Sequence, residues 1–343
     1  MAGRGRGAAS RVVIVAGVQC PRLVAAAGAL QLGAMRRCGR LAALALVAAC
    51  TESPPTATHD GSLVSSQLQG QPHPFWARGR GPASPQATPG DTVAWHQGNV
   101  ILASKTLAIF WGRDWSDPTF AGDKITGLTS FFEGWSNSHY ANILTEYAGA
   151  NGQITAASTY LGSVIDSSRA PIDAPNIDPP ADELATVVSE ICRVVDVPDP
   201  AAVYMVYTTA RFTPATGYCA FHMWGTCGRH PIQFAFYPAI DTISGCSPND
   251  TFTSHSPALA TLASATAHEL SEAITDARIG TGWWDDVTGE EIADKCEGVF
   301  LVPFVTFSNN STWHLQGEWS NSAFDAGTGS PNIIGEPGCL YGR

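Results

Sequence analysis

Residues 256–276 read SPALATLASATAHELSEAITD, and this stretch predicts the helix around which the rest of the fold is arranged. Ser256 is a favourable N-cap, and Pro257 fits the first helical position, where its missing N–H costs no hydrogen bond. One side of the predicted helix is apolar or small at the 3.6-residue period, through Leu259, Leu262, Ala263, Thr266, Leu270 and Ala273. We therefore expect a helix over residues 257–277 with this side buried against other elements.

The segments before this helix alternate between strand and helix patterns. Three of them have the apolar character of buried strands: residues 100–111, Ala202–Tyr207 and Ile232–Tyr237. Two others have apolar residues on one helical face: the segment opened by Pro118, with Ile125, Leu128, Phe131 and Phe132, and residues 182–195. The alternation predicts an α/β (α+β) fold, a mixed sheet with packed helices, followed by a loop-rich, disulfide-tied C-terminal third.

His268 and Glu272 are four positions apart on the predicted helix, so both side chains point to one side and can bind the same metal ion. Glu269 lies one step around the helix, where it could hold a water molecule on that ion. This is the arrangement of HExxH zinc hydrolases, in which the glutamate is the general base, with a carboxylate here in place of the second histidine. The alternative is a solvated acidic helix face, since HExxE also occurs by chance in surface helices.

Glu291 and Asp294 follow the helix at a spacing that resembles thermolysin-like zincins. Glu291 is nineteen residues beyond Glu272, where those enzymes have their third ligand, and an aspartate that orients a histidine follows soon after. The resemblance implies Glu291 as the ligand and Asp294 as the partner of His268, although Asp294 could itself be the ligand. The strand Ile232–Tyr237 corresponds to the edge strand that lines such clefts.

Several other residues near these motifs have two interpretations. His222, flanked by aromatic residues, is either a packed core histidine or a catalytic residue that stabilises an oxyanion or completes the metal shell. Residues 283–286 (Trp-Trp-Asp-Asp) either wall the site or divide between core and loop. Asp276 is expected to be a helix-terminal or loop group, with calcium binding as the alternative. His255 and His314 are expected in loops.

An ordered series of motifs makes residues 95–343 resemble a bacterial member of the EXORDIUM-like, phosphate-induced protein family. The motifs are Leu107–Gly112, Phe131-Phe132, Tyr140, Thr145–Tyr147, Tyr218–His222, His268–Asp276 and Glu291–Cys296. Plant members are secreted, cell-wall-associated growth-response proteins, so the resemblance implies a role outside the cytoplasm. This chain keeps the HExxE residues, which favours a metal site here.

The N-terminal residues have the charge and composition of a leader. Residues 1–50 contain seven arginines and no acidic residue, and the basic stretch at Met35 precedes an apolar run too short for the roughly 20 residues that span a bilayer. Cys50 ends a lipobox-like sequence, so we expect a lipoprotein signal peptide with Met35 as the true start; an ordinary signal peptide is the alternative. Residues 51–90 are rich in Pro and Gly and predict a disordered tether, which leaves residues 91–343 as the folded domain.

The charge of the chain beyond the leader argues against one class of partner. Residues 51–343 hold 12 of the 19 basic and all 30 acidic side chains, a balance of −18 compared with −11 for the whole chain. Nucleic-acid binding depends on Lys and Arg that neutralise phosphates, so this acidic body is not expected to bind nucleic acid.

Six cysteines lie beyond the leader: Cys192, Cys219, Cys227, Cys246, Cys296 and Cys339. An even number in an exported chain predicts three disulfides. We expect a local bridge between Cys219 and Cys227, and a second between Cys296 and Cys339 that fixes the C-terminal segment. The lack of any CxxC pair argues against a zinc finger.

Two functions are compatible with these observations. The first is a membrane-anchored zinc hydrolase of peptides or of a cell-envelope polymer, with zinc on His268, Glu272 and either Glu291 or Asp294, and Glu269 as base. Several carboxylate ligands would also suit a harder ion such as calcium or manganese. The second is a non-catalytic surface lipoprotein that binds glycans or a protein, in which the acidic cluster is structural or binds calcium.

Overall fold

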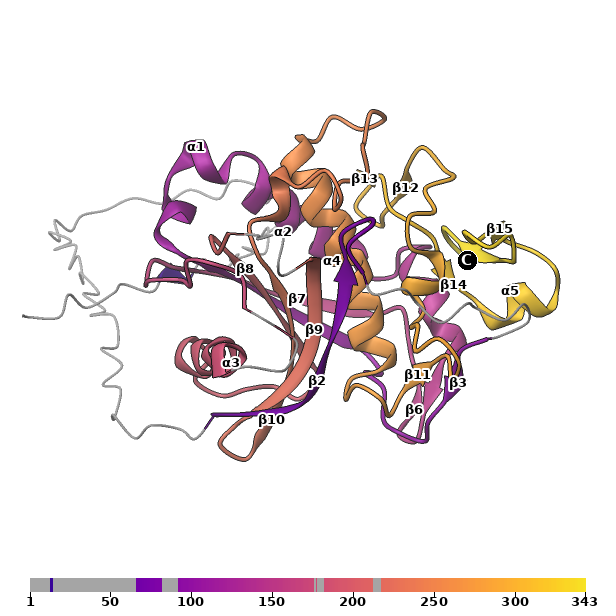
Figure 1. Ribbon diagram of the computed structural model, residues 1–343, viewed down its shortest axis with the longest axis horizontal. Helices are drawn as coiled ribbons and strands as arrows, with labels where there is room; N and C mark the ends of the chain where they lie inside the picture. Colours follow the sequence, from indigo (N-terminus) through magenta and orange to yellow (C-terminus); the bar gives the residue numbers. More distant parts are fainter. Residues whose placement is uncertain (1–12, 15–65, 82–91, 176, 178–181, 212–216) are drawn as a thin grey trace, which may run out of the picture. The chain divides into compact units, whose positions relative to one another are not determined.

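The computed structural model describes residues 13–14, 66–81, 92–175, 177, 182–211 and 217–343 (Figure 1). The chain divides into a unit of residues 1–16 and 64–343 and a second unit of residues 17–63, and every described residue belongs to the first. Apart from Val13 and Ile14, the predicted leader lies outside the described residues, and so does the predicted lipidation site Cys50.

A seven-stranded mixed sheet forms the centre of the described unit. Its strands, in spatial order, are β1 (Val13–Ile14), β7 (Ser158–Asp166), β4 (Ser104–Trp111), β8 (Ala202–Thr208), β10 (His230–Tyr237), β9 (Tyr218–Cys227) and β2 (Ser66–Trp76). The neighbours β7, β4, β8 and β10 run parallel, whereas β1, β9 and β2 pair antiparallel. The predicted α/β (α+β) fold with a mixed sheet is confirmed.

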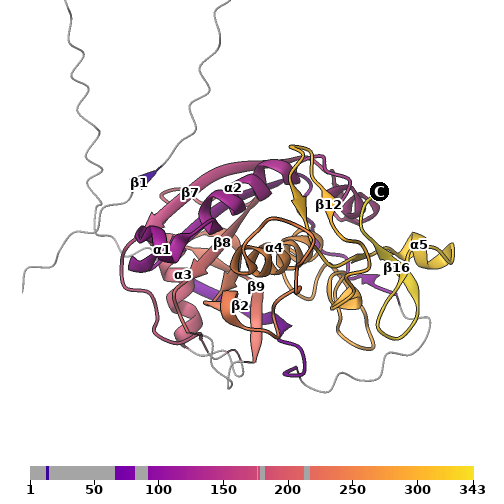
Figure 2. The ribbon, with the colours of Figure 1, turned by 90° about the horizontal axis from the view of Figure 1, so that it is seen from above.

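Helices cover both faces of the sheet, which is why β8 is buried along its whole length and β4 over its last four residues. Side chains alternate between the faces of a strand, so Phe110 packs toward α2 (Lys124–Trp135) and α4 (Pro257–Thr275), whereas Ile109 and Trp111 pack toward α3 (Asp182–Val194). Figures 1 and 2 show α3 on one side of the strands and α2 and α4 on the other.

The other elements are short and lie mostly in the loops and in the C-terminal third. The strands are β3 (Ala94–Trp95), β5 (Ala148–Gly149), β6 (Gly152–Gln153), β11 (Trp283–Trp284), β12 (Val305–Thr306), β13 (Thr312–Trp313), β14 (Glu318–Trp319), β15 (Ser330–Pro331) and β16 (Pro337–Leu340). The helices are α1 (Pro118–Ala121), α5 (Asn321–Asp325) and the 3-10 turns η1 (Arg113–Ser116), η2 (Ala141–Glu146), η3 (Ile240–Thr242) and η4 (Asp294–Cys296). The helix predicted from Pro118 is thus divided into α1 and α2, because Gly122 at φ +51° ends the first part.

Helix α4 begins as predicted, with the Ser256 hydroxyl accepting the N–H of Leu259 and Pro257 in the first turn. Every residue from Leu259 to Thr275 is buried, and not only the predicted apolar side. The sheet lies on one side of α4 and the C-terminal third on the other (Figure 1). The interpretation of the HExxE residues as a solvated surface face is therefore wrong.

The folded part begins earlier than the predicted residue 91. Residues 66–76, assigned to the tether, form β2, which pairs with β9 as the last strand of the sheet. Prolines at 72 and 74 made this segment look like a linker, but an edge strand tolerates residues that cannot donate a hydrogen bond. β2 also has the edge position that was predicted for Ile232–Tyr237; that strand, β10, lies inside the sheet.

Three disulfides are present, and two of their pairings differ from the prediction. Cys192 is bonded to Cys227 and Cys219 to Cys246, while the predicted Cys296–Cys339 bridge is confirmed. A Cys219–Cys227 bridge is impossible because both lie on β9, where eight residues of extended chain span about 26 Å.

The disulfides indicate an oxidising compartment outside the cytoplasm. No helix among the described residues is long and apolar enough to cross a membrane.

Candidate metal centre

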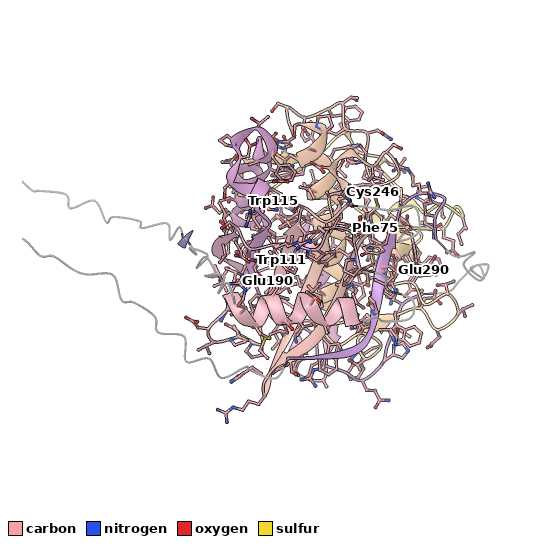
Figure 3. All side chains as sticks on the ribbon, turned by 60° about the vertical axis from the view of Figure 1, so that its left-hand side comes forward. Phe75, Trp111, Trp115, Glu190, Cys246 and Glu290 are labelled. Atoms are coloured by element: carbon pink, nitrogen blue, oxygen red, sulfur yellow. A yellow bond between two sulfur atoms is a disulfide. The ribbon has the colours of Figure 1, made fainter. Side chains whose placement is uncertain are left out.

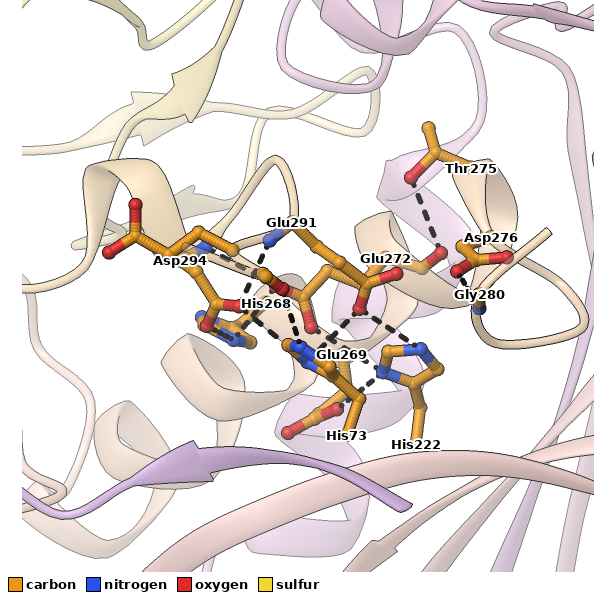
Figure 4. A network of polar contacts seen from close by, with 12 residues as sticks. His73, His222, His268, Glu269, Glu272, Thr275, Asp276, Gly280, Glu291 and Asp294 are labelled. Atoms are coloured by element: carbon orange, nitrogen blue, oxygen red, sulfur yellow. Dashed lines mark hydrogen bonds and ion pairs between the residues drawn. The ribbon is translucent and has the colours of Figure 1, made fainter. Parts of the chain in front are cut away.

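All six side chains predicted as catalytic or metal-binding meet at one place between α4 and the sheet (Figure 4). They come from three parts of the chain: His268, Glu269 and Glu272 from α4, Glu291 and Asp294 from the segment entering η4, and His222 from β9. The cluster is shielded from solvent, and even its most accessible member among these six, Asp294, has only 12% of its side chain exposed.

A seventh residue, His73 of β2, also belongs to the site, and the sequence analysis missed it. Its backbone pairs with that of His222 across β2 and β9, so the two imidazoles are neighbours, with ring centroids 5.7 Å apart. Phe75, two residues further on β2, stacks on the ring of His268 at 4.1 Å. The aromatic pair Phe75-Trp76 was the available signal, because such residues are uncommon in a disordered tether.

Four of these residues form one group, which we call the donor set: His73, His222, Glu272 and Glu291. One potential ligand atom from each lies within 4.8 Å of those of the others. Glu291 Oε2 is 3.1 Å from His73 Nδ1 and 3.3 Å from His222 Nε2. Two imidazoles and two carboxylates thus converge on a space of the size that one metal ion occupies.

A second, overlapping group consists of His268, Glu272 and Asp294. His268 Nε2 is 3.1 Å from Glu272 Oε1 and 3.3 Å from Asp294 Oδ1. Asp294 is therefore on the same side of the His268 ring as Glu272, and it does not hold the opposite ring nitrogen in the way that a zincin-like aspartate would. Asp294 Oδ2 instead accepts the backbone N–H of Glu291 at 3.1 Å.

The hydrogen bonds of His73 and His222 leave a lone pair directed into the donor set. His73 Nε2 is 3.1 Å from the carbonyl oxygen of Gly289, which can only accept, so this nitrogen carries the hydrogen and Nδ1 is free to bind a cation. His222 Nδ1 is 3.2 Å from Glu269 Oε2, so its Nε2 is correspondingly free toward Glu291. Metal-binding histidines characteristically donate their other N–H to a carbonyl or carboxylate in this manner.

His268 has the opposite arrangement. Gln316 Nε2 donates to the carbonyl of Ala293 at 2.7 Å, which fixes the amide with its NH2 group 3.2 Å from His268 Nδ1. His268 Nδ1 therefore accepts, and its Nε2 carries a hydrogen toward Glu272 and Asp294. In this tautomer His268 Nε2 lies at ion-pair distance from both carboxylates, without an aligned hydrogen bond among the described residues, and it does not present a lone pair to a metal.

Five buried atoms of the donor set lack a hydrogen-bond partner among the described residues. They are Nδ1 of His73, Nε2 of His222, Oε2 of Glu272 and both carboxylate oxygens of Glu291. An unpaired buried polar atom costs about 1–3 kcal/mol, so five around one point identify a place for a missing partner. Each is an electron-pair donor, and the residues therefore fit a cation.

The charges of the cluster support the same conclusion. The four carboxylates of the cluster face three imidazoles, and among the described residues no lysine or arginine forms an ion pair with them. Lys295, next to Asp294 in sequence, pairs instead with Asp285 at 2.5 Å. The balancing positive charge must come from protons on the imidazoles or from a bound cation.

The pKa values show how protons supply that charge when no cation is bound. Burial lowers the pKa of His222, but its contacts with Glu269 and Glu272 outweigh burial and raise the pKa to about 9. Burial raises the pKa of Glu291, and the charge of Glu272 raises it further. A proton thus occupies places where a metal would bind, so protons and metal compete for this site.

The remaining predicted residues lie around the cluster. Trp284 lines a cavity of about 170 Å³ that opens beside His73 and Glu291, whereas Trp283 packs against Tyr147. Asp276 caps the loop after α4 by accepting the backbone N–H groups of residues 280, 281 and 282, which occupies both its oxygens. The predicted loop or helix-terminal role of Asp276 is confirmed.

His255 and His314 lie away from the cluster. Both lie outside helices and strands, as predicted, and each bonds to a backbone carbonyl, of Thr312 and Pro303 respectively.

A comparison of the chain with protein-family models finds no match, and neither does a comparison with curated protein sequences. The resemblance to the EXORDIUM-like family therefore stays a prediction.

Proposed function

We propose that this chain is an exported metal-dependent hydrolase whose donor set, His73, His222, Glu272 and Glu291, holds a zinc ion. The observation that carries the proposal is the convergence of five unpaired electron-pair donors from these four residues in a buried space. The proposal keeps Glu272 and Glu291 from the predicted ligands and replaces His268 with the two histidines of β2 and β9.

The donor types favour zinc over calcium. Calcium takes six to eight oxygen ligands, whereas zinc accepts four ligands that include imidazole nitrogen and carboxylate oxygen. Two nitrogens and two carboxylates match the second pattern, and manganese is the harder alternative. When bound, such an ion supplies Lewis-acid chemistry, which polarises a carbonyl group or makes a water molecule more acidic.

The residues around the donor set have separate roles in this proposal. Glu269 accepts the Nδ1–H of His222 and so orients that imidazole, while its Oε1 is unpaired and is available to take a proton from water. Burial raises the pKa of Glu269, which makes it a stronger base than an exposed glutamate. His268 lies at ion-pair distance from Glu272 and Asp294 and helps to keep both carboxylates in place.

The substrate that fits the site is an extended peptide. Among the described residues β9 is the only strand that pairs with β2, so the outer edge of β2 has unpaired backbone groups. A peptide can add to such an edge as a further strand. The cavity lined by His73, Trp284 and Glu291 opens beside this edge and would admit one peptide group to the donor set.

The attachment proposed for this hydrolase is a lipid on Cys50. The disulfides support an oxidising location outside the cytoplasm, and an N-terminal lipid anchor would hold the domain at the cell envelope. Mass spectrometry of the exported chain would detect the acyl groups. An unmodified N-terminus formed by cleavage elsewhere would contradict this part of the proposal.

Metal analysis of the exported chain tests the donor set. We expect about one zinc per chain, lost in His73→Gln and retained in His96→Gln, a matched control whose histidine pairs with Asp286 outside the cluster. Glu269→Gln should keep the metal, because its amide oxygen still accepts the His222 hydrogen, and should lose peptide hydrolysis. A metal-free chain that hydrolyses no peptide would instead support the non-catalytic lipoprotein.

A further inference from the structure

The parallel part of the sheet has a second place suited to ligand binding, at the carboxyl ends of β4 and β7. After β4 the chain turns to the face of α1 and α2, and after β7 it turns to the opposite face, where α3 packs. Neighbouring parallel strands whose connections leave in opposite directions leave a crevice between them, and open α/β sheets bind ligands in that crevice. None of its residues belongs to the metal centre.

The structure has a cleft at this position. Two adjoining cavities, each of about 500 Å³, share the segment of residues 169–172 that follows β7. One is bordered by Trp111 at the end of β4, and the other by Arg113 and by Arg211, beyond the end of β8. Figure 3 looks onto this side of the sheet, with α3 in front and Trp111 and Glu190 labelled.

Gly112, in the turn after β4, packs against the side chain of Thr209, which lines the cleft. Gly112 has φ +132°, and a Cβ atom there would lie 2.5 Å from the hydroxyl of Thr209. Only glycine fits this turn without displacing its neighbour. Gly112 also donates its N–H to the carbonyl of Asp166, which ties the turn after β4 to the end of β7.

The cleft is basic although the chain as a whole is acidic. Arg113, Arg169 and Arg211 line one cavity together with a single acidic side chain, Asp114. Arg211 is 3.6 Å from Asp173, but Arg113 and Arg169 form no ion pair or hydrogen bond through their side chains within the described part of the chain. Two guanidinium groups are therefore free to bind an anion, and guanidinium binds phosphate oxygens through two parallel hydrogen bonds.

The rest of the cleft wall is apolar. Ile172, half of whose surface is exposed, and Pro171 border both cavities, and the indole of Trp111 borders one. The Trp111 indole N–H donates to the Ser168 hydroxyl, and the ring is almost wholly buried, so it contributes only a small part of the apolar wall. A ligand here would combine an anionic end with an apolar body.

We propose that this cleft binds an organic phosphate ester, with the phosphate on Arg113 and Arg169 and the apolar part against Pro171 and Ile172. A phosphate is favoured over a carboxylate because two unpaired guanidinium groups, with Arg211 nearby, match a dianion. The cleft and the metal centre are separate, so this binding does not depend on the hydrolase activity.

Calorimetric titration of the full exported chain with phenyl phosphate at low ionic strength tests the proposal. We expect saturable binding that weakens about tenfold in Arg169→Gln and in Arg113→Gln, the effect of losing one charge-assisted contact. Arg229→Gln is the matched control, since it removes the same charge from the exposed β9–β10 turn, at the opposite end of the parallel strands from the cleft. Its affinity should equal that of the unaltered chain.

Two further ligands test the role of the apolar wall and the preference for phosphate separately. Inorganic phosphate should bind more weakly than phenyl phosphate if the apolar wall contributes, and benzoate should bind more weakly if the site selects phosphate. Equal or tighter binding of benzoate would overturn the phosphate assignment. Absence of saturable phenyl phosphate binding, or an equal loss in Arg229→Gln and Arg169→Gln, would overturn the site itself.

Discussion

The molecule has two clusters of buried carboxylates, one on each face of the sheet, and they are neutralised differently. On the α3 face, Asp166 of β7 and Glu190 of α3 both bind the guanidinium of Arg193, which is 2.6 Å from Glu190 Oε1. On the α4 face, histidines are the only basic side chains that pair with Glu272 and Glu291 among the described residues. The first cluster contains a permanently charged guanidinium, whereas the second has only imidazoles, whose charge depends on bound protons.

The unpaired atoms and the pKa values follow this difference. Within the described chain, every buried carboxylate oxygen of Asp166 and Glu190 has a partner. Burial raises the pKa of Asp166, but hydrogen bonds with Glu190 and Ser168 and the charge of Arg193 lower it to about 2. Burial is the main reason that the pKa of Glu190 is raised to about 7. Near neutral pH at least one of these carboxylates is ionised, and Arg193 balances it.

Burial of acids therefore does not by itself indicate a metal site. An acidic cluster is a candidate only where the chain lacks the cation that its carboxylates require and where donor atoms lack partners. The cluster on the α4 face meets both conditions, and the cluster on the α3 face meets neither. The following predictions test this distinction.

Removal of metal should have the largest effect on stability. A ligand at a thousand times its dissociation constant stabilises the folded state by about 4 kcal/mol, which corresponds to roughly 10 °C in Tm for a chain of this size. Adding a chelator to the exported chain should lower Tm by about that amount, and zinc should restore it. His73→Gln is the control, because its Tm should not respond to the chelator. An unchanged Tm in the unaltered chain would show that the cluster on the α4 face needs no bound metal, so that the two clusters would not differ in this respect.

Replacement of the internal cation should have a smaller effect. Arg193→Met leaves Asp166 and Glu190 buried without their guanidinium, and we expect it to destabilise the fold by about 2 kcal/mol. This is less than for a fully buried pair, because 43% of the Arg193 side chain is exposed. Urea unfolding with and without zinc measures it, and zinc should not rescue the variant, because no histidine contacts Asp166 or Glu190 among the described residues. Rescue by zinc would show that any buried acid pair here can bind metal.

The smallest of the three expected effects is the change of zinc affinity with each unit of pH. Below about pH 9 the imidazole of His222 carries a second proton in the metal-free protein, and zinc must displace this proton. Apparent affinity should therefore rise about tenfold per pH unit for each displaced proton up to that pH, and then become constant. Competition with a chelator at several pH values measures this slope, and an affinity independent of pH would contradict the assignment of His222 as a ligand.

Much of the fold could be predicted because its signals are local. The capped start of α4 and the apolar runs of β4, β8 and β10 depend on neighbouring residues, and they predicted the elements correctly. The position of β2 could not be predicted in this way, because its pairing partner β9 is about 150 residues away and its prolines resemble a linker. The Cys219–Cys227 pairing failed for a related reason, since closeness in sequence is not closeness in space along an extended strand.

As with the fold, the residues of the candidate site were predicted where the signal was local in sequence. The helical spacing of His268, Glu269 and Glu272 pointed to the helix that contributes three residues to the cluster, and the cluster contains every residue singled out as catalytic or metal-binding. Spacing alone does not reveal which nitrogen of a histidine carries a hydrogen, and that depends on Gln316 and on the Gly289 carbonyl. Those partners come from loops, and they are the reason that the proposed ligands differ from the HExxE pattern.

Anomalous diffraction would show whether the donor set binds a zinc ion. Data collected at the zinc absorption edge from crystals of the exported chain should give one strong peak between His73 Nδ1, His222 Nε2 and the carboxylates of Glu272 and Glu291. No peak at this position, or a peak beside His268 and Asp294 without His73, would contradict the account.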